Sequence, residues 1–468
     1  MKPLIEDRQR LRAFLAMNGP ASRQALLRAL GLATRTVTRM LAELGDEVLA
    51  MGATRQRRFA LRRPLRGELL DEPLYAIDEE GAVTELGRLQ LVRPEGSFLD
   101  LGSSPWPVDA EADLGWWAGL PYPVVDVRPQ GFLGRLFAKR HGQDLALDAN
   151  PDKWTDDAVV VALRAYGIDT VGNLVLGHRA LEQVHARWLE PLCPERETAA
   201  QLAARYAALA ERTMREGIPG SSAGGEFPKF LAARRLKGAH TPHCIVKFSG
   251  ADGSTAVLRW ADLLVCEHLA LQALATLPGH ACASSRILQH AGRTFLESER
   301  FDRHGDHGRS PLVSLLSVDA ALIGTGGDWS DWSDCARRLA ALGLLDEAQV
   351  QRVDEMLLFS KLIANTDTHL GNLSLAPRAG AAPKAFDIAP AYDLLPMAYA
   401  PLSGGELPQP KYTPPLPRPD QQAAWGRAFD AAQRFWERAA VDERISEGFR
   451  VVCAANLERL RRAGQLVR

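Results

Sequence analysis

The spacing of apolar residues divides the first 66 positions into three short helices and a β-hairpin. A first helix has an apolar face around Leu11. Ser22 is placed to cap a second helix that ends at Gly31, and Thr34 is placed to cap a third. Residues 48–61 have the appearance of a β-hairpin. This order of elements predicts a winged helix-turn-helix, because a short turn joins the second and third helices.

The remaining 402 positions mix strand and helix patterns, so we expect an α+β protein. Strands are predicted at 74–77, 86–89, 243–248, 256–260 and 293–300, with a turn at 250–253 between the third and the fourth. Helices are predicted at 158–165, 197–215, 263–274, 421–439 and 443–463. Seven prolines between positions 401 and 419 exclude regular structure there.

The composition is that of an ordinary globular protein, with 46% hydrophobic and 24% charged residues. No run of apolar residues is long enough to predict a membrane span, and the start of the chain lacks the pattern of a signal peptide. The six cysteines are scattered, without the spacing of a zinc or redox motif. We therefore expect a cytoplasmic protein with reduced thiols and no membrane partner.

The net charge of −1 hides a strong asymmetry along the chain. Residues 1–66 hold 14 Lys/Arg and 5 Asp/Glu, a net charge of +9, whereas the remainder carries −10. A basic segment beside an acidic body suggests that the segment binds duplex DNA. The expected contacts are Arg35, Thr36 and Arg39 on the third helix, for the major groove, and Arg55, Arg57 and Arg58 near the hairpin tip, for phosphates. A small basic helical unit with solvated arginines is the alternative.

Two segments suggest phosphate binding, although neither is specific alone. Residues 217–229 are rich in glycine and serine, which lets backbone N–H groups approach an anion. The segment is not a Walker loop, since Glu226 stands where that motif has lysine, and a flexible linker would look similar. Lys247 lies among apolar residues on a predicted strand, as the phosphate-pairing lysine of kinases does. Glu267 on the next helix could hold it, but a simple strand-face lysine is an alternative.

The third segment is the most informative one. Asp367 and Asn372 have the Asp-x-x-x-x-Asn spacing of a kinase catalytic loop, in which the aspartate accepts the substrate proton and the asparagine binds Mg²⁺. A downstream carboxylate should complete the metal site, and spacing alone leaves both Asp387 and Asp393 open. His369 is expected to fix the loop rather than to act as a base.

These motifs resemble the HipA kinases, which are toxins of type II toxin–antitoxin systems. The matching segments are Ser221-Ser222-Ala223-Gly224-Gly225, Lys247, Glu299-Arg300-Phe301-Asp302-Arg303, Asn365 to Asn372 and Pro390 to Leu395. The fused N-terminal helix-turn-helix resembles the YjjJ-like subgroup. The resemblance implies a distant relative of protein kinases, with a β-rich N-lobe and a helical C-lobe. The implied divisions are a DNA-binding domain at 1–66, an N-terminal subdomain at 67–215, an N-lobe at 216–305 and a C-lobe at 306–468.

The resemblance also implies roles for individual residues. Asp367 would be the catalytic base, and Asn372 and Asp393 would bind Mg²⁺. ATP would contact the Gly/Ser loop (Ser221, Ser222, Gly224 and Gly225), Lys247, Glu299 and Phe301, and Ser221 would be autophosphorylated. Family toxins phosphorylate aminoacyl-tRNA synthetases, so a translation factor would be the protein substrate.

The resemblance has limits. The loop sequence Glu226-Phe227-Pro228-Lys229 differs from that of the founding member. The fusion of a DNA-binding segment leaves open whether a separate antitoxin exists. Two rival functions also stay open: a kinase for small molecules or lipid headgroups, and a transcription regulator that uses the kinase fold as a ligand sensor.

Overall fold

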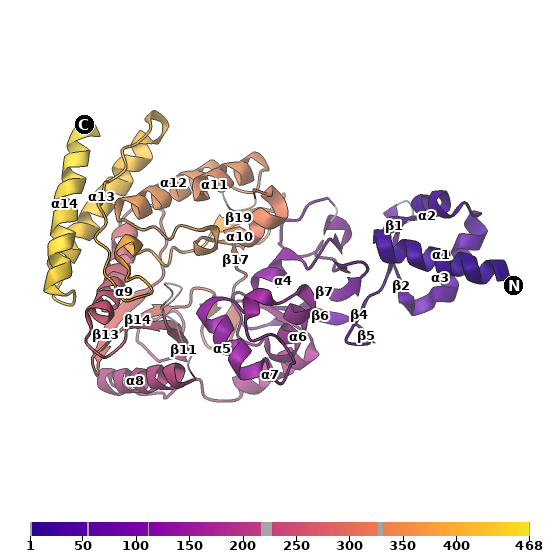
Figure 1. Cartoon of the computed structure of the whole chain (residues 1–468), viewed down its shortest axis with the longest axis horizontal. Coiled ribbons are helices and arrows are strands. Elements are labelled where there is room, and N and C mark those ends of the chain that lie inside the picture. Colours follow the sequence, from indigo (N-terminus) through magenta and orange to yellow (C-terminus); the bar gives the residue numbers. More distant parts are fainter. Residues whose placement is uncertain (1, 54–55, 111, 217–226, 326–330, 468) are drawn as a thin grey trace.

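The computed structural model describes residues 2–53, 56–110, 112–216, 227–325 and 331–467. The molecule is elongated, with an N-terminal head at one end and two long C-terminal helices at the other (Figure 1). Helices and antiparallel sheets are mixed throughout the described residues, in agreement with the expected mixture of α and β structure.

The head consists of three helices and a small antiparallel sheet. Its helices are α1 (Lys2–Asn18), α2 (Arg23–Leu30) and α3 (Thr34–Leu44), and its strands lie in the order β1 (Ala21–Ser22), β3 (Arg58–Leu61), β2 (Val48–Met51). Leu11, Leu26, Val37 and Met40 are fully buried in one apolar cluster that belongs to the head alone. The three helices and the β2–β3 hairpin therefore agree with the prediction, whereas strand β1 was not expected.

The helix ends follow the expected capping in one case and not in the other. Ser22 Oγ accepts a hydrogen bond from the Ala25 N–H at 3.2 Å, and Gly31 ends α2 in the left-handed conformation with φ 67°. The expected cap at Thr34 is wrong by one position. Thr34 is already helical, and Ala33 at the N-cap has no side-chain oxygen to offer.

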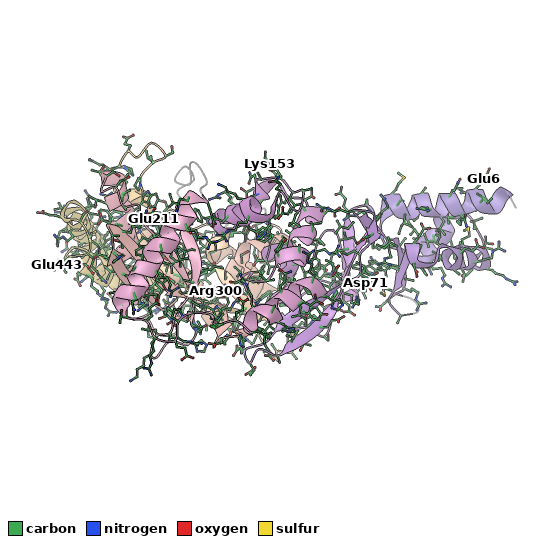
Figure 2. All side chains as sticks on the ribbon, turned by 90° about the horizontal axis from the view of Figure 1, so that it is seen from below. Glu6, Asp71, Lys153, Glu211, Arg300 and Glu443 are labelled. Carbon is green, nitrogen blue, oxygen red and sulfur yellow. The ribbon has the colours of Figure 1, made fainter. Side chains whose placement is uncertain are left out.

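Backbone hydrogen bonds join the head to the rest of the chain, which is called the body below. The Arg63 N–H donates to Leu91 O and the Arg93 N–H donates to Leu61 O, both at 2.8 Å. One apolar cluster spans this junction and contains Leu49, Ala60, Val92, Phe98 and Trp116. Figure 2 shows the head projecting from the body, with Glu6 near its far end and Asp71 near the junction. The orientation of the head is therefore fixed by packing and hydrogen bonds.

The first part of the body is a five-stranded antiparallel sheet covered by helices. Its strand order is β10 (Leu174–Leu176), β6 (Glu72–Ile77), β7 (Val83–Val92), β8 (Gly96–Phe98), β9 (Trp116–Trp117). The helices are α4 (Tyr122–Asp126), α5 (Gly131–His141), α6 (Asp156–Tyr166) and α7 (His178–Trp188), and a short hairpin of β4 (Pro64–Leu65) and β5 (Glu68–Leu69) precedes the sheet. The predicted strands at 74–77 and 86–89 and the helix at 158–165 lie within β6, β7 and α6.

A second sheet carries the candidate lysine. Its strand order is β11 (Lys229–Ala233), β12 (His243–Phe248), β14 (Arg293–Glu299), β13 (Ser285–His290). Residues of α8 (Ala199–Arg215) pack with Phe230, Phe248 and Phe295 in one cluster, whereas α9 (Thr255–Leu274) packs with Leu296 in the main core. The two helices therefore cover opposite faces of this sheet.

The expected strand at 256–260 is wrong, because these residues form the start of α9. Ser254 Oγ accepts a hydrogen bond from the Val257 N–H at 3.3 Å and caps the helix there. The helix then continues into the buried run that begins at Asp262. The strand propensity of Val257 and Trp260 gives way to this longer buried helix.

The last part of the chain is mainly helical. It contains α10 (Leu315–Val318), α11 (Trp332–Ala341), α12 (Glu347–Leu362), α13 (Gln422–Ala439) and α14 (Glu447–Val467). Two small sheets accompany them, β15 (Arg303–His304) with β16 (Gly308–Arg309), and β17 (Val313–Ser314), β18 (Ser374–Pro377), β19 (Phe386–Ile388). The proline-rich stretch before residue 419 has neither helix nor strand, as expected.

Candidate active site

Lys247 lies between two carboxylates from distant parts of the chain. Its Nζ is 2.8 Å from both carboxylate oxygens of Glu267 on α9, and 2.6 Å from Oδ1 of Asp393, which follows β19. The Glu267 side chain is only 2% exposed, whereas that of Asp393 is 27% exposed. The lysine therefore has one buried anchor and one partner at the edge of the site.

The pKa shifts of Lys247, Glu267 and Asp393 follow from their burial and from their pairing with one another. Burial opposes the charge of Lys247, but Asp393 and Glu267 outweigh it and raise the pKa of the lysine. Burial would raise the pKa of Asp393, yet Lys247 and Lys229 hold that pKa below its ordinary value. The pKa of Glu267 is raised, because its burial exceeds the effect of Lys247. At neutral pH the lysine is charged and Asp393 is an anion paired with it.

The geometry separates the two downstream aspartates that spacing could not distinguish. Asp387 accepts hydrogen bonds from Arg378 Nε at 3.0 Å and Nη2 at 2.7 Å, and from Gln349 Nε2 at 2.5 Å. Its carboxylate is therefore held by Arg378 and Gln349 and not by the candidate lysine. Asp393, in contrast, lies beside Lys247.

The loop at 365–372 is held by its own polar groups. Asn365 Oδ1 accepts from the Asp367 N–H at 3.0 Å, and Asn372 Nδ2 donates to Asp367 O at 2.9 Å. His369 Nδ1 accepts from the Gly371 N–H at 3.1 Å, and Trp332 Nε1 donates to His369 O at 2.9 Å. These contacts leave the Asp367 carboxylate 46% exposed, with His369 Nε2 3.6 Å from its Oδ1. His369 thus orders the turn, which is the role expected from the sequence.

Tyr392 connects this loop with the segment of Asp393, a role that was not expected from the sequence. Its hydroxyl donates to Gly371 O at 3.0 Å and lies 2.8 Å from Ser374 Oγ. Its ring centroid is 5.9 Å from that of Phe301. Asp393 next to it has φ 58°, a left-handed conformation that is uncommon for residues other than glycine and that gathers at functional sites. The structure thus brings Phe301, Tyr392 and Asp393 next to the loop.

The charged residues of the segment Glu299 to Arg303 form two separate sets of ion pairs. Glu299 Oε1 accepts from Arg234 Nη2 at 2.8 Å, so its carboxylate is occupied within the sheet. Asp302 Oδ2 pairs with Arg300 Nη2 at 2.8 Å and with Arg303 Nη1 at 2.7 Å. Both arginines also reach Oδ1 of Asp169, at 2.6 and 3.1 Å. Arg300 lies within the body in Figure 2, where this ion-pair cluster joins the second sheet to the segment before β10.

Comparison with known proteins identifies the family. Residues 70–185 match the YjjJ-like toxin, middle domain, and residues 221–454 match the HipA-like C-terminal domain. The chain is 34% identical over 453 residues to Toxin YjjJ of Escherichia coli (strain K12), an alignment that covers 97% of this chain and 98% of that protein. The chain belongs to the YjjJ-like toxins of the HipA family. The resemblance read from the motifs is thereby confirmed.

Two solved structures are also similar to this HipA-family chain. One is a chain of the HipA, HipB and operator DNA complex of the Shewanella oneidensis MR-1 toxin–antitoxin system, at 17% identity and a TM-score of 0.48, covering 84% of this chain and 96% of that one. The other is the Helicobacter pylori proinflammatory kinase CtkA, at 14% identity and a TM-score of 0.35, covering 52% of this chain and 92% of that one.

Some expected site residues of this HipA-family chain fall outside the described residues. These are Ser221, Ser222, Gly224 and Gly225 of the Gly/Ser loop and Arg55 of the hairpin. The described residues after the loop approach the lysine. Lys229 is the strand partner of Lys247, and the Phe227 ring centroid is 5.9 Å from Lys247 Nζ.

The expected DNA contacts lie in two places on the head. Arg35 and Arg39 are exposed on α3, with Thr36 half-buried between them. Arg39 has only a loose ion pair with Glu43 at 3.8 Å. Arg57 is exposed and donates from Nε to Gly52 O at 3.2 Å, whereas Arg58 is half-buried at the start of β3. Among the residues that the structure describes, no helix has the length and apolar character needed to cross a membrane.

Proposed function

We propose that this HipA-family chain is an ATP- and Mg²⁺-dependent Ser/Thr protein kinase with a DNA-binding head. The observation that supports it most strongly is the position of Lys247 between Glu267 and Asp393. A lysine held by a helical glutamate next to a metal-binding aspartate is the arrangement by which kinases engage ATP phosphates.

Asp393 and Asn372 have the oxygen donors that Mg²⁺ prefers, one carboxylate and one amide. Because Asn372 Nδ2 donates to Asp367 O, its amide oxygen is left for a cation. The bound Mg²⁺ would supply charge neutralisation of the ATP phosphates. Lys247 would bind the phosphates, and the Phe301 ring, half-buried against Tyr392, would pack against adenine. Since Glu299 is tied to Arg234, its segment would contact adenine through main-chain groups.

Asp367 is the group placed to accept the proton of a substrate hydroxyl. Its carboxylate is 46% exposed, while its backbone is fixed at both N–H and C=O. A fixed but accessible carboxylate suits transfer to a macromolecular hydroxyl, since positioning supplies most of the catalysis in phosphoryl transfer. The proposed substrate is a protein of the translation machinery, such as an aminoacyl-tRNA synthetase.

The head would act as a winged helix-turn-helix. Its helix α3 presents Arg35, Thr36 and Arg39, and the β2–β3 hairpin carries Arg57 and Arg58. A helix that exposes basic and hydroxyl side chains suits the major groove, and a basic hairpin suits phosphates. The similar HipA chain of Shewanella oneidensis MR-1 was solved in a complex with HipB and operator DNA. We propose DNA and an antitoxin as partners of this chain.

Phosphoproteomics in cells tests the kinase proposal. Cells that express the full chain are compared with cells that express Asp367→Asn at equal abundance. We expect new phosphoserine or phosphothreonine on one or a few translation proteins with wild type alone. Identical phosphoproteomes with both proteins would contradict a protein substrate.

A further inference from the structure

A large cavity lies apart from the candidate active site, between the helices of the first sheet and the edge of the second. It measures about 960 Å³ and is lined by residues of α5, α7, α8 and β11 and by the segments 166–171 and 303–309. Lys247, Glu267, Asp367 and Asp393 are not among its lining residues. Pockets of about 300–1,000 Å³ are the size that holds small ligands. Figure 1 shows α5, α7, α8 and β11 in the same region of the body.

The wall of this cavity is positively charged. Among the residues described, seven arginines and four carboxylates line it. Three of the carboxylates are occupied by groups of the protein. Asp126 accepts from Ser314 and Ser317, Asp169 pairs with Arg300 and Arg303, and Asp306 pairs with Arg235.

Only some of the seven arginines that line the cavity form ion pairs with carboxylates. Four are paired with carboxylates, namely Arg140 and Arg212 with Glu216, Arg205 with Glu197, and Arg303 with Asp302. The side chains of Arg128 and Arg187 have no hydrogen bond or ion pair with any described residue, and both are exposed. An excess of cationic groups therefore faces the cavity.

Arg309 is the third arginine that has no ion pair with a carboxylate of the described residues, although Asp169 and Asp302 are near enough to act on its pKa. It is only 6% exposed, its Nη2 donates to Ile168 O at 2.8 Å, and its Nη1 is buried without an acceptor. Burial, and next the charge of Arg303, lower its pKa to about 9. A buried guanidinium with an unmade hydrogen bond is costly, and an anion in the cavity would offset that cost.

Aromatic rings line the same cavity. The rings of His141 and Tyr166 stack with centroids 4.1 Å apart and an interplanar angle of 22°. Those of Trp188 and His307 lie 4.8 Å apart at 31°. Arg309 donates to Ile168 O, and Arg309, Ile168 and Tyr166 all line the cavity. Flat rings next to guanidinium groups suit a planar base joined to a phosphate.

We propose that this cavity binds a nucleoside phosphate at a site separate from the one for ATP. Arg128 and Arg187 bind the phosphate, the charge of Arg309 favours it, and the His141–Tyr166 or Trp188–His307 pair contacts the base. The cavity touches both the first sheet's helices and β11, so an occupied site would couple these two parts of the body.

Calorimetric titration of the full-length protein tests this proposal. The probes are AMP, GMP, CMP and pyrophosphate, each at low ionic strength with EDTA. The variants are Arg128→Gln/Arg187→Gln, the matched control Arg462→Gln on the exposed face of α14, and Lys247→Ala, which removes the phosphate-binding lysine of the candidate active site. Equal urea midpoints confirm that the variants are folded.

We expect at least one nucleotide to bind wild type, with affinity at least tenfold lower in the double arginine variant and unchanged in the other two. Binding of pyrophosphate alone would support the phosphate part and overturn the nucleoside part. The proposal is overturned if no probe binds, if the double variant binds equally well, or if Lys247→Ala abolishes binding.

Discussion

Lys247 and Asp393 are 146 residues apart in the chain, and their Nζ and Oδ1 atoms lie 2.6 Å from each other. The contact joins the second sheet to the segment after β19. It also distinguishes Asp393 from Asp387, whose carboxylate is paired with Arg378.

The two aspartates should respond differently to removal of their charge. Asp393→Asn should lower phosphoryl transfer by on the order of a thousandfold, because a metal ligand contributes several kcal/mol to the transition state. Asp387→Asn should retain transfer within about threefold and lose at most about 1 kcal/mol of stability, since its ion pair is half exposed. Initial rates with labelled ATP check both. The opposite order of effects would assign the metal site to Asp387.

The ion-pair cluster of Arg300, Arg303, Asp169 and Asp302 should make stability depend on pH in acid. Burial favours the neutral acids, but the two guanidinium groups outweigh it and hold the pKa of Asp169 and Asp302 far below the ordinary value. A depressed folded pKa stabilises the protein above the unfolded pKa of about 4, and this contribution is lost as the pH falls further.

Asp302→Asn tests this dependence. It should cost about 3–5 kcal/mol of unfolding free energy at pH 7, because two buried arginines lose a partner. The difference from wild type should shrink by about 1.4 kcal/mol per pH unit below pH 4, because the unfolded wild-type chain binds a proton at Asp302 that the folded protein does not. Urea unfolding between pH 7 and pH 3 measures it, with the exposed Asp420→Asn as control. A difference that stays constant over this range would show that the Asp302 charge is not the cause.

DNA binding by the head should be electrostatic and dependent on α3. Each lost phosphate contact should reduce the slope of log affinity against log salt by about 0.9. Arg57→Ala with Arg58→Ala should therefore weaken binding to all sequences, whereas Arg35→Ala or Arg39→Ala should relax sequence preference. Fluorescence anisotropy of the full chain on a duplex library measures both, with Arg462→Ala as control. An absence of salt-dependent binding at low ionic strength would make the head a protein-docking unit.

Autophosphorylation is expected in the Gly/Ser loop, at Ser221 or next at Ser222. A phosphoserine there would add about −1.5 to −2 charges where we expect the ATP phosphates to bind, and so should lower ATP affinity. Mass spectrometry after incubation with Mg-ATP should find the phosphate in wild type and not in Asp367→Asn. An unmodified loop in an enzyme that phosphorylates another protein would rule out this self-inactivation.

The sequence predicted local elements well where capping and periodicity agree. Ser22 and Gly31 delimit α2 as expected, and β12 has the predicted bounds. The error at 256–260 arose because strand propensity is local, whereas α9 owes its start to Ser254 and its stability to the buried residues from 262 onward. Strand propensity does not include the stabilisation that the helix gains from burying these residues.

The sequence predicted which residue types carry the candidate chemistry and their order along the chain. It did not predict which of these side chains are in contact. Spacing suggested that Glu267 could hold Lys247, and the two are in contact. Spacing could not choose between Asp387 and Asp393, because only the fold brings Arg378 to one and Lys247 to the other. The link from Tyr392 to Gly371 spans 21 residues, and the sequence carries no signal for it beyond the tyrosine's place before Asp393.

The most direct test of the kinase claim is transfer of labelled γ-phosphate from Mg-ATP by the purified full-length protein. Wild type should incorporate label into itself or an added extract protein. Asp367→Asn, with the same urea midpoint and the same affinity for Mg-ATP, should lose on the order of a thousandfold in rate. Equal incorporation by Asp367→Asn, or none by wild type with bound Mg-ATP, would contradict the account.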